Sequence, residues 1–193
     1  NGDFRNINAP TEDLKKLQKK LSELLWECQK EIRKNNGIDS NISHAFEKEK
    51  SIITNAIIHR NRRIVLNIDL EDFFGSIHFG RVKGFFEKNR DFKLSPEVAT
   101  IIAQLACYRG VLPQGAPSSP IITNLICNMI DIRLLKIATK YKVNYTRYAD
   151  DLTFSTNNKP FLDKQSEFLS EVTKEIERSG FKVNNKKTRI LFR

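Results

Sequence analysis

The sequence predicts an α+β fold, in which helices pack on one face of a largely antiparallel sheet. Residues 64–70, IVLNIDL, form an apolar, β-branched run that is typical of a buried strand. Residues 145–155, YTRYADDLTFS, place strand-forming residues on both sides of Ala149, Asp150 and Asp151, which predicts a hairpin with the two acids at its tip. Helical patterns separate these strands along the chain, which favours this class.

Amphipathic segments predict the helices around this sheet. Leucines at 14, 17, 21, 24 and 25 recur at helical spacing, so we expect a helix from Thr11 to about Lys34 with a basic outer face. Ser95 and Pro96 form a helix start, since serine caps a helix and proline suits its first turn. Similar patterns predict a short helix before residue 60 and helices over 81–88, 121–142 and 160–179. The segment 181–192, FKVNNKKTRILF, predicts a strand, a turn and a strand that form a terminal hairpin.

The composition is that of an ordinary globular chain with a basic balance. Its 193 residues suit one domain, or a large lobe with a smaller one attached. Hydrophobic residues make up 39% and charged residues 29%, which excludes a disordered chain. The formal net charge is +10, and the basic residues are spread along the chain. This favours a polyanionic partner such as nucleic acid, although a solvated basic surface would give the same composition.

The cysteines and the apolar runs indicate a cytoplasmic location without a membrane partner. Cys28, Cys107 and Cys127 lie far apart among apolar neighbours, so we expect buried free thiols in a reducing compartment. No apolar run approaches the about 20 residues of a membrane span, and the first ten residues lack a signal-peptide core. Because the chain does not begin with Met and stops abruptly after Arg193, we expect a piece of a longer protein.

Three carboxylates carry the predicted chemistry. Asp69 comes late in the predicted buried strand, and Asp150 and Asp151 lie at the predicted hairpin tip, so one sheet could bring all three together. Adjacent carboxylates are costly to ionise unless a cation sits between them. Mg²⁺ prefers such hard oxygen ligands and leaves positions for water and phosphates. A pair of such ions catalyses phosphoryl transfer, so with the basic charge we predict phosphodiester chemistry.

Four segments also resemble motifs A, B, C and D of reverse transcriptases in order and approximate spacing: NIDLEDFFGSI at 67–77, LPQGAPSSP at 112–120, YADDLTFS at 148–155 and GFKVNNKKTRI at 180–190. The resemblance is greatest to the bacterial, retron-type enzymes and their group II intron-like relatives, because Asn55, Ala56 and His59 form the NAxxH arrangement of retron enzymes. It implies a right-hand polymerase with a fingers region at 1–63 and a palm region at 64–193, where fingers elements could also lie between 80 and 115. We recognise no thumb in residues 1–193.

The resemblance implies roles for the motif A and motif C residues. Asp69, Asp150 and Asp151 would bind two Mg²⁺ ions, and the backbone amides from Leu70 to Phe73 would lie near the triphosphate. Phe74 falls at the position of a bulky steric gate, where an aromatic ring would clash with a 2′-hydroxyl and so select deoxynucleotides. Phe74 could alternatively be a core residue.

Motifs B and D supply the remaining candidates. Gln114 matches the position that contacts the incoming nucleotide, and Gly115 keeps that loop slim enough for close approach. Lys187 matches the motif D lysine that would protonate the leaving pyrophosphate. Gln114 could instead satisfy backbone groups of the loop, and Lys187 could be a solvated surface charge.

Other polar residues have simpler interpretations. We expect Glu71 and Asp72 to be exposed or capping residues, and Asp131 to form a local ion pair with Arg133 on the same helix. His59 and Asn55 lie one helical turn apart, so this pair could either contact RNA or brace the fold.

The resemblance therefore implies an RNA-directed DNA polymerase that uses Mg²⁺ and deoxynucleoside triphosphates on an RNA template and holds an RNA–DNA hybrid. A retron-type enzyme would also have a cognate structured non-coding RNA, RNA-linked cDNA as its product, an effector protein as a partner and a role in defence against phage. Two alternatives remain open at this point. The chain could belong to a group II intron-like, diversity-generating or abortive-infection enzyme, or it could be a catalytically silent RNA-binding scaffold.

Overall fold

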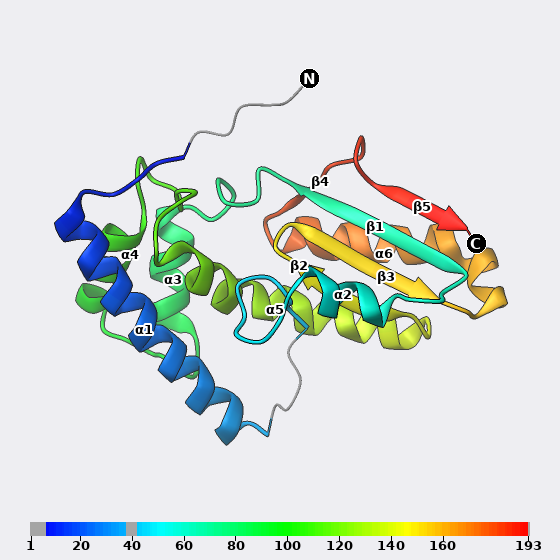
Figure 1. Cartoon of the computed structure of the whole chain (residues 1–193), viewed down its shortest axis with the longest axis horizontal. Coiled ribbons are helices and arrows are strands. Elements are labelled where there is room, and N and C mark those ends of the chain that lie inside the picture. The colour runs from blue at the N-terminus through cyan, green and yellow to red at the C-terminus, as the bar shows by residue number, and fades with distance from the viewer. Residues whose placement is uncertain (1–6, 38–41, 193) are drawn as a thin grey trace. The chain divides into compact units, whose positions relative to one another are not determined.

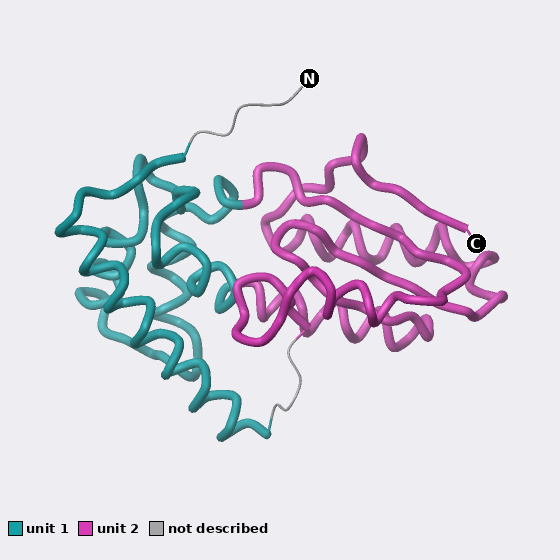
Figure 2. Tube along the Cα trace, viewed as in Figure 1, with its two compact units in different colours: residues 1–39, 74–126 teal, residues 40–73, 127–193 magenta. Residues whose placement is uncertain are grey.

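The computed structural model describes residues 7–37 and 42–192. The chain divides into two compact units, and each unit combines two separate stretches of sequence (Figure 2). Unit 1 comprises residues 1–39 and 74–126, and unit 2 comprises residues 40–73 and 127–193. These units are defined by how compactly the chain packs and not by polymerase regions. The fingers region at 1–63 and the palm region at 64–193 therefore stay a prediction.

Unit 1 is helical. It contains α1 (Glu12–Asn35), α3 (Phe79–Lys88), α4 (Pro96–Ala106) and the first turns of α5 (Ser119–Lys140), which continues into unit 2. Helix α4 begins as the sequence predicts, since the Ser95 side chain accepts a hydrogen bond from the amide of Val98 and Pro96 occupies the first turn. It contacts both α1 and α3, and the side chain of Gln18 on α1 donates to the carbonyl oxygen of Leu105 at 2.7 Å.

Unit 2 is built around an antiparallel sheet. Its elements are α2 (Ile52–Ile58), β1 (Ile64–Glu71), β2 (Asn144–Tyr148), β3 (Asp151–Thr156), a 3₁₀ helix η1 (Lys159–Lys164), α6 (Gln165–Arg178), β4 (Lys182–Val183) and β5 (Arg189–Phe192). The strand order is β2-β3-β1-β4, and β5 also pairs with β1. Figure 1 shows β1 and β3 side by side, with α6 behind them.

The two faces of this sheet differ in character. Leu66 of β1 is paired with Phe154 of β3, and the Phe154 ring meets the Phe168 ring of α6 edge to face, with centroids 5.2 Å apart. Neighbouring residues along a strand point to opposite faces, so Asn67 and its partner Thr153 lie on the other face. There the Asn67 amide donates to the Thr153 hydroxyl at 3.2 Å. One face is therefore an aromatic and aliphatic core, and the opposite face is polar.

Helix α2 contacts the sheet at β2, by the polar face. His59, which ends this helix, is 8% exposed, and its ring nitrogens lie 2.7 Å from the hydroxyls of Ser155 and Thr146. The sequence predicts helices on one face only, and it does not predict this second contact. His59 therefore braces α2 against two strands of its unit.

Other expectations have mixed outcomes. The predicted terminal hairpin is wrong, because β4 and β5 both pair with β1 at different registers: Leu70 is partnered with Val183 and Asn67 with Arg189. Cys127 is buried, whereas Cys28 and Cys107 are half-buried, and all three are free thiols. Glu71 and Asp72 are exposed, as predicted. Among the residues that the structure describes, no helix is long and apolar enough to cross a membrane.

Candidate active site

Strand pairing brings the three predicted carboxylates to one end of the sheet. Asp69 of β1 is the register partner of Asp151 of β3, and the amide of Leu70 donates to the carbonyl oxygen of Asp150 at 3.0 Å. Partnered residues on adjacent strands project from the same face. Asp69 and Asp151 therefore share the polar face, and Asp150 precedes Asp151 in the turn.

The turn between β2 and β3 has a strained backbone. Tyr148 is paired with Asp151, so Ala149 and Asp150 form a two-residue loop. Ala149 has a φ of 55°, in the left-handed region that costs an L-residue about 1–2 kcal/mol. Glycine is favoured where a tight hairpin needs a positive φ, so an alanine here requires support from its surroundings.

Lys187 reaches the same site from the segment between β4 and β5. Its Nζ lies 3.4 Å from Oδ2 of Asp69, and its side chain is 58% exposed against 11% for that of Asp69. The segment is attached to β1 through its backbone, because the amide of Asn184 donates to the carbonyl oxygen of Asp69 at 2.8 Å. The structure thus places the four residues predicted to be catalytic at the same end of the sheet.

The donor chemistry of this site suits a divalent cation. Carboxylates from two paired strands supply hard oxygen ligands on one face, and a lysine ammonium already lies beside one of them. Within residues 7–37 and 42–192, however, no three His, Cys, Asp or Glu side chains are grouped closely enough to hold a metal ion. A bound cation would therefore require a rearrangement of these side chains.

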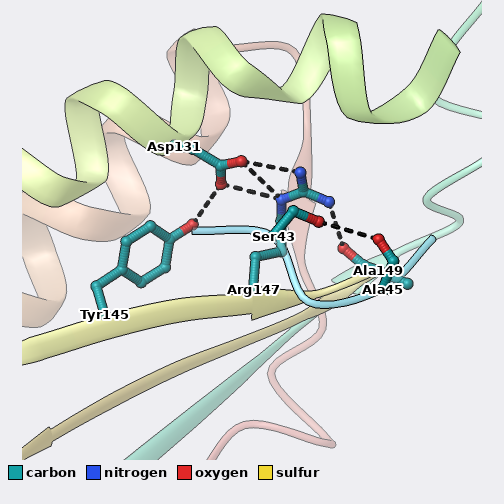
Figure 3. Close-up of polar contacts among 6 residues, drawn as sticks. All are labelled: Ser43, Ala45, Asp131, Tyr145, Arg147 and Ala149. Atoms are coloured by element: carbon teal, nitrogen blue, oxygen red, sulfur yellow. Dashed lines mark hydrogen bonds and ion pairs between the residues drawn. The ribbon is translucent and has the colours of Figure 1, made fainter. Parts of the chain in front are cut away.

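A buried polar cluster lies on the core face close to the turn. The guanidinium of Arg147 on β2 is bonded to the carboxylate of Asp131 on α5, with Nε–Oδ1 at 2.9 Å and Nη2–Oδ2 at 2.8 Å (Figure 3). The hydroxyl of Tyr145 donates to Asp131 at 2.8 Å. The side chains of Arg147 and Asp131 are 0% and 3% exposed.

The electrostatics of this cluster follow from burial and from the carboxylate. Burial, and then the negative charge of Asp131, raise the pKa of Tyr145 well above its ordinary value. Burial alone would lower the pKa of Arg147, but the adjacent carboxylate raises it above its ordinary value. Tyr145 therefore remains a neutral donor, and Arg147 remains a cation.

Sequence reasoning missed this cluster and assigned Asp131 wrongly. Asp131 does not pair with Arg133, which instead bonds Glu175 of α6 at 2.9 Å. Residues two apart on a helix do not face each other, so the two side chains leave α5 in different directions. Two signals were available in the sequence. Asp131 is an acid within an apolar helix, and Arg147 lies two residues after Tyr145, so both side chains point to the same face of the strand.

Comparison with known families decides the identity of this fold. Residues 1–192 match the family model described as reverse transcriptase (RNA-dependent DNA polymerase). The chain belongs to the reverse transcriptase family. The matched region includes all four predicted motifs, so the resemblance noted from the sequence is confirmed.

Similar reverse transcriptases include several retron enzymes. The chain is 38% identical to the retron Ec86 reverse transcriptase of Escherichia coli over 96% of its own length and 53% of that protein. It is 33% identical to the retron Mx65 reverse transcriptase of Myxococcus xanthus, over 98% of its own length and 45% of that protein. The predicted resemblance to the retron type is thus confirmed. The chain spans about half the length of these curated relatives.

Solved structures with a similar fold include telomerases. The apo telomerase of Candida tropicalis matches with a TM-score of 0.62 at 14% identity, covering 91% of this chain and 37% of that one. At this identity the likeness concerns the fold alone. It confirms the predicted α+β class with a reverse-transcriptase-like arrangement.

The remaining predicted residues of the reverse transcriptase motifs are distributed over both units. Leu70 is 2% exposed, and its amide is engaged by Asp150. Phe74, Gln114 and Gly115 belong to unit 1. Phe74 is half-buried, and the carbonyl oxygen of Gln114 accepts a hydrogen bond from the amide of Asn8 at 3.0 Å. The role of these four residues in nucleotide binding stays a prediction.

Gly115 is required by the local geometry of motif B. Its φ is 101°, and a Cβ at this position would lie 2.7 Å from Cγ2 of Ile7. A side chain would therefore be excluded both by the backbone conformation and by the close approach of the N-terminal segment.

Proposed function

We propose that the protein is an RNA-directed DNA polymerase, a nucleotidyltransferase that adds deoxynucleotides to a primer 3′-hydroxyl. The observation that carries this proposal is the pairing of Asp69 with Asp151, which unites the acids of motifs A and C on the polar face of the sheet. Membership of the reverse transcriptase family supports the same activity.

In the proposed reaction, Asp69, Asp150 and Asp151 would hold two Mg²⁺ ions. These ions would supply activation of the 3′-hydroxyl and stabilisation of the charge that develops on the leaving pyrophosphate. The fit rests on the donor set, which is two carboxylates from paired strands, a third in the adjoining turn and a cation already attracted to one of them. The carboxylates also orient the reacting groups, because they are attached to the hydrogen-bonded ends of β1 and β3.

Lys187 is the proposed proton donor to pyrophosphate. Its Nζ balances the charge of Asp69 at 3.4 Å, and its side chain is more than half exposed, so it can move away when divalent cations arrive. A lysine that is released in this way carries a proton on a flexible chain close to the leaving group.

Four motif residues are proposed to bind the nucleotide, as the resemblance implies. Phe74 would exclude a 2′-hydroxyl and so favour deoxynucleotides, as the resemblance implies. Gln114 and Gly115 would form the nucleotide-contacting loop of motif B, and the backbone that follows Leu70 would lie near the triphosphate.

The proposed partners are an RNA template and an RNA–DNA hybrid. A net charge of +10 supports binding to phosphates, so affinity should fall steeply as salt rises. Similarity to retron enzymes supports a cognate structured non-coding RNA, an RNA-linked cDNA product, an effector protein and phage defence as the biological setting. Three free thiols favour the cytoplasm.

Primer extension tests the proposal. The full-length protein that contains this chain is given an RNA template, a DNA primer, Mg²⁺ and the four deoxynucleotides, and it is compared with an Asp150→Asn, Asp151→Asn double variant. We expect extension by the parent and none by the variant. The control is Asp163→Asn, which removes an exposed carboxylate from η1 and should extend normally. Equal extension by the parent and the double variant would refute the proposal, and a parent that binds RNA but never extends would favour a silent scaffold.

A further inference from the structure

Arg147 contacts the backbone of the turn that carries the acids. While its Nε and Nη2 bond Asp131, its Nη1 donates to the carbonyl oxygen of Ala149 at 3.3 Å (Figure 3). That carbonyl belongs to the peptide group that joins Ala149 to Asp150. The orientation of this peptide plane fixes the direction in which the Asp150 residue leaves the turn.

The arginine itself is held from several sides. Its amide donates to the carbonyl oxygen of Ile42 at 3.1 Å, and its own carbonyl oxygen accepts from the amide of His44 at 2.8 Å, so its backbone is paired with residues 42–44. The hydroxyl of Ser43 in this segment donates to the carbonyl oxygen of Ala45. Asp131 bonds Nε and Nη2 of the guanidinium and so fixes the plane of this group. The direction of Nη1, the remaining nitrogen, is therefore also fixed.

Stability alone does not account for this arrangement. A fully buried ion pair gains little over a well-packed apolar replacement, because removing two charges from water is expensive. The surrounding positions are occupied by a packed core, which includes Leu152, the register partner of Arg147. What an apolar residue could not provide is a donor aimed at the Ala149 carbonyl, next to a backbone held at a positive φ.

We propose that Arg147 is a positioning residue, which is anchored by Asp131 and fixes the Ala149–Asp150 peptide so that the Asp150 carboxylate is directed at the metal site. The inference rests on the proposed function, since it assigns Asp150 to metal binding. Asp150 is then held from two directions, by Arg147 through the preceding peptide and by the Leu70 amide through its own carbonyl oxygen. Pairing with Asp131 also neutralises the guanidinium, which would otherwise repel cations.

The first test compares Arg147→Lys with Tyr145→Phe in the full-length protein. Lysine keeps the charge, but a single ammonium on a flexible stem cannot reproduce the rigid fork that reaches Asp131 and Ala149 together. Tyr145→Phe disturbs the same cluster by removing one donor to Asp131, and it leaves the contact with Ala149 in place. Two readouts follow, namely Mn²⁺ affinity by calorimetry and hydrogen exchange of the Leu70 amide, which is bonded to Asp150.

We expect Arg147→Lys to weaken Mn²⁺ binding and to accelerate Leu70 exchange about tenfold each, with a fall in kcat and little change in the KM for primer–template. Tyr145→Phe should leave both readouts within about twofold of the wild type. Equal effects of the two substitutions would overturn the inference, because they would indicate a general loosening of the core.

A second variant separates positioning from folding. The variant combines Tyr145→Phe, Asp131→Leu and Arg147→Met, so the whole cluster becomes apolar. It removes one negative and one positive buried charge together, and it should preserve or raise Tm. The inference predicts that this stable triple variant still loses Mn²⁺ affinity and Leu70 protection. Wild-type values for both would contradict it. Neither readout needs polymerisation, so a wild-type protein that fails in primer extension would refute the proposed function alone.

Discussion

Two ion pairs of unit 2 lie close to the same turn, and they differ in almost every physical respect. Arg147 and Asp131 are buried on the core face, with side chains 0% and 3% exposed and a two-nitrogen contact at 2.8–2.9 Å. Lys187 and Asp69 meet on the polar face, with side chains 58% and 11% exposed and a single contact at 3.4 Å. The first pair is enclosed in the core, and the second is the one that we propose to be exchangeable.

The difference shows how one sheet can combine a rigid contact with a proposed exchangeable site. Breaking a buried pair leaves a charge without compensation in a low-dielectric interior, so the core-face pair cannot open without unfolding. A lysine pair that is open to solvent at its ammonium end contributes about 0–1 kcal/mol, so we expect Lys187 to give way to a metal ion at little cost. The turn is thus fixed on the core face by Arg147, while the carboxylate on the polar face can exchange its partner.

The largest effect should come from the exchangeable side, in activity. Asp69→Asn removes one proposed metal ligand, and we expect primer extension by the full-length protein to fall by on the order of a thousandfold. Tm should stay the same or rise, because a carboxylate beside Asp151 is lost. Extension rates and melting curves of the variant and of Asp163→Asn measure both. Retention of more than a tenth of the activity would remove Asp69 from the proposed site.

The buried pair should give the largest effect on stability. Asp131→Ala leaves the guanidinium of Arg147 unpaired in the core, and we expect the free energy of unfolding to fall by about 3–5 kcal/mol. Urea denaturation measures this, with Glu175→Ala as a comparison, because it breaks the more exposed pair with Arg133. A cost below about 1 kcal/mol for Asp131→Ala would mean that the two kinds of pair are equivalent.

His59 provides an intermediate effect that depends on pH. Burial, and then the positive charges of His44 and Arg62, lower the pKa of His59 from 6.5 to about 4. The unfolded chain takes up this proton at a higher pH than the folded chain, so the contribution is present in full above pH 6.5 and is lost as the pH falls towards 4. With allowance for partial solvent screening, the loss should be roughly 2 kcal/mol.

Denaturation curves at pH 7 and pH 4.5 for the wild type and His59→Gln measure this contribution. The variant should be less stable at pH 7, because it disturbs the bonds to Ser155 and Thr146, and it should lose less stability on acidification. Identical pH profiles would show that His59 does not titrate in this window.

The smallest effect on stability belongs to Lys187. Lys187→Ala should change the free energy of unfolding by less than about 1 kcal/mol, since the lysine end of the pair with Asp69 is more than half exposed. Activity should still fall by about 10²-fold, because a proton donor is lost. Without nucleotide, Mn²⁺ should bind the variant at least as tightly as the wild type, since no ammonium competes for Asp69. Weaker Mn²⁺ binding, followed by calorimetry, would indicate that the lysine supports the metal site and does not exchange with it.

The sequence predicted the site better than it predicted the surroundings of the site. Motif spacing and the apolar run before Asp69 were sufficient to place the acids, because register on a buried strand is fixed by its hydrophobic pattern. The pairing of Asp131 with Arg147 was not accessible in this way. It depends on the direction in which a side chain leaves a helix and on contact between elements, whereas the local pattern pointed to Arg133.

The strand pairing at the end of the chain could not be predicted from local sequence patterns either. The segment 181–192 has the composition of a hairpin, but β4 and β5 each find their partner in β1, which is 100 or more residues away in the sequence. The 3₁₀ helix η1 before α6 escaped prediction because its residues continue the helical pattern of the segment.

The most direct test of the central claim is where a divalent cation binds. Mn²⁺ added to the isotope-labelled full-length protein should broaden the amide signals of Leu70, Asp150 and Asp151 before others, and this broadening should disappear in Asp69→Asn. That result would place the metal between β1 and the turn, where the exchangeable pair lies. Broadening elsewhere, or an unchanged pattern in Asp69→Asn, would contradict the assignment of these carboxylates as the catalytic metal site.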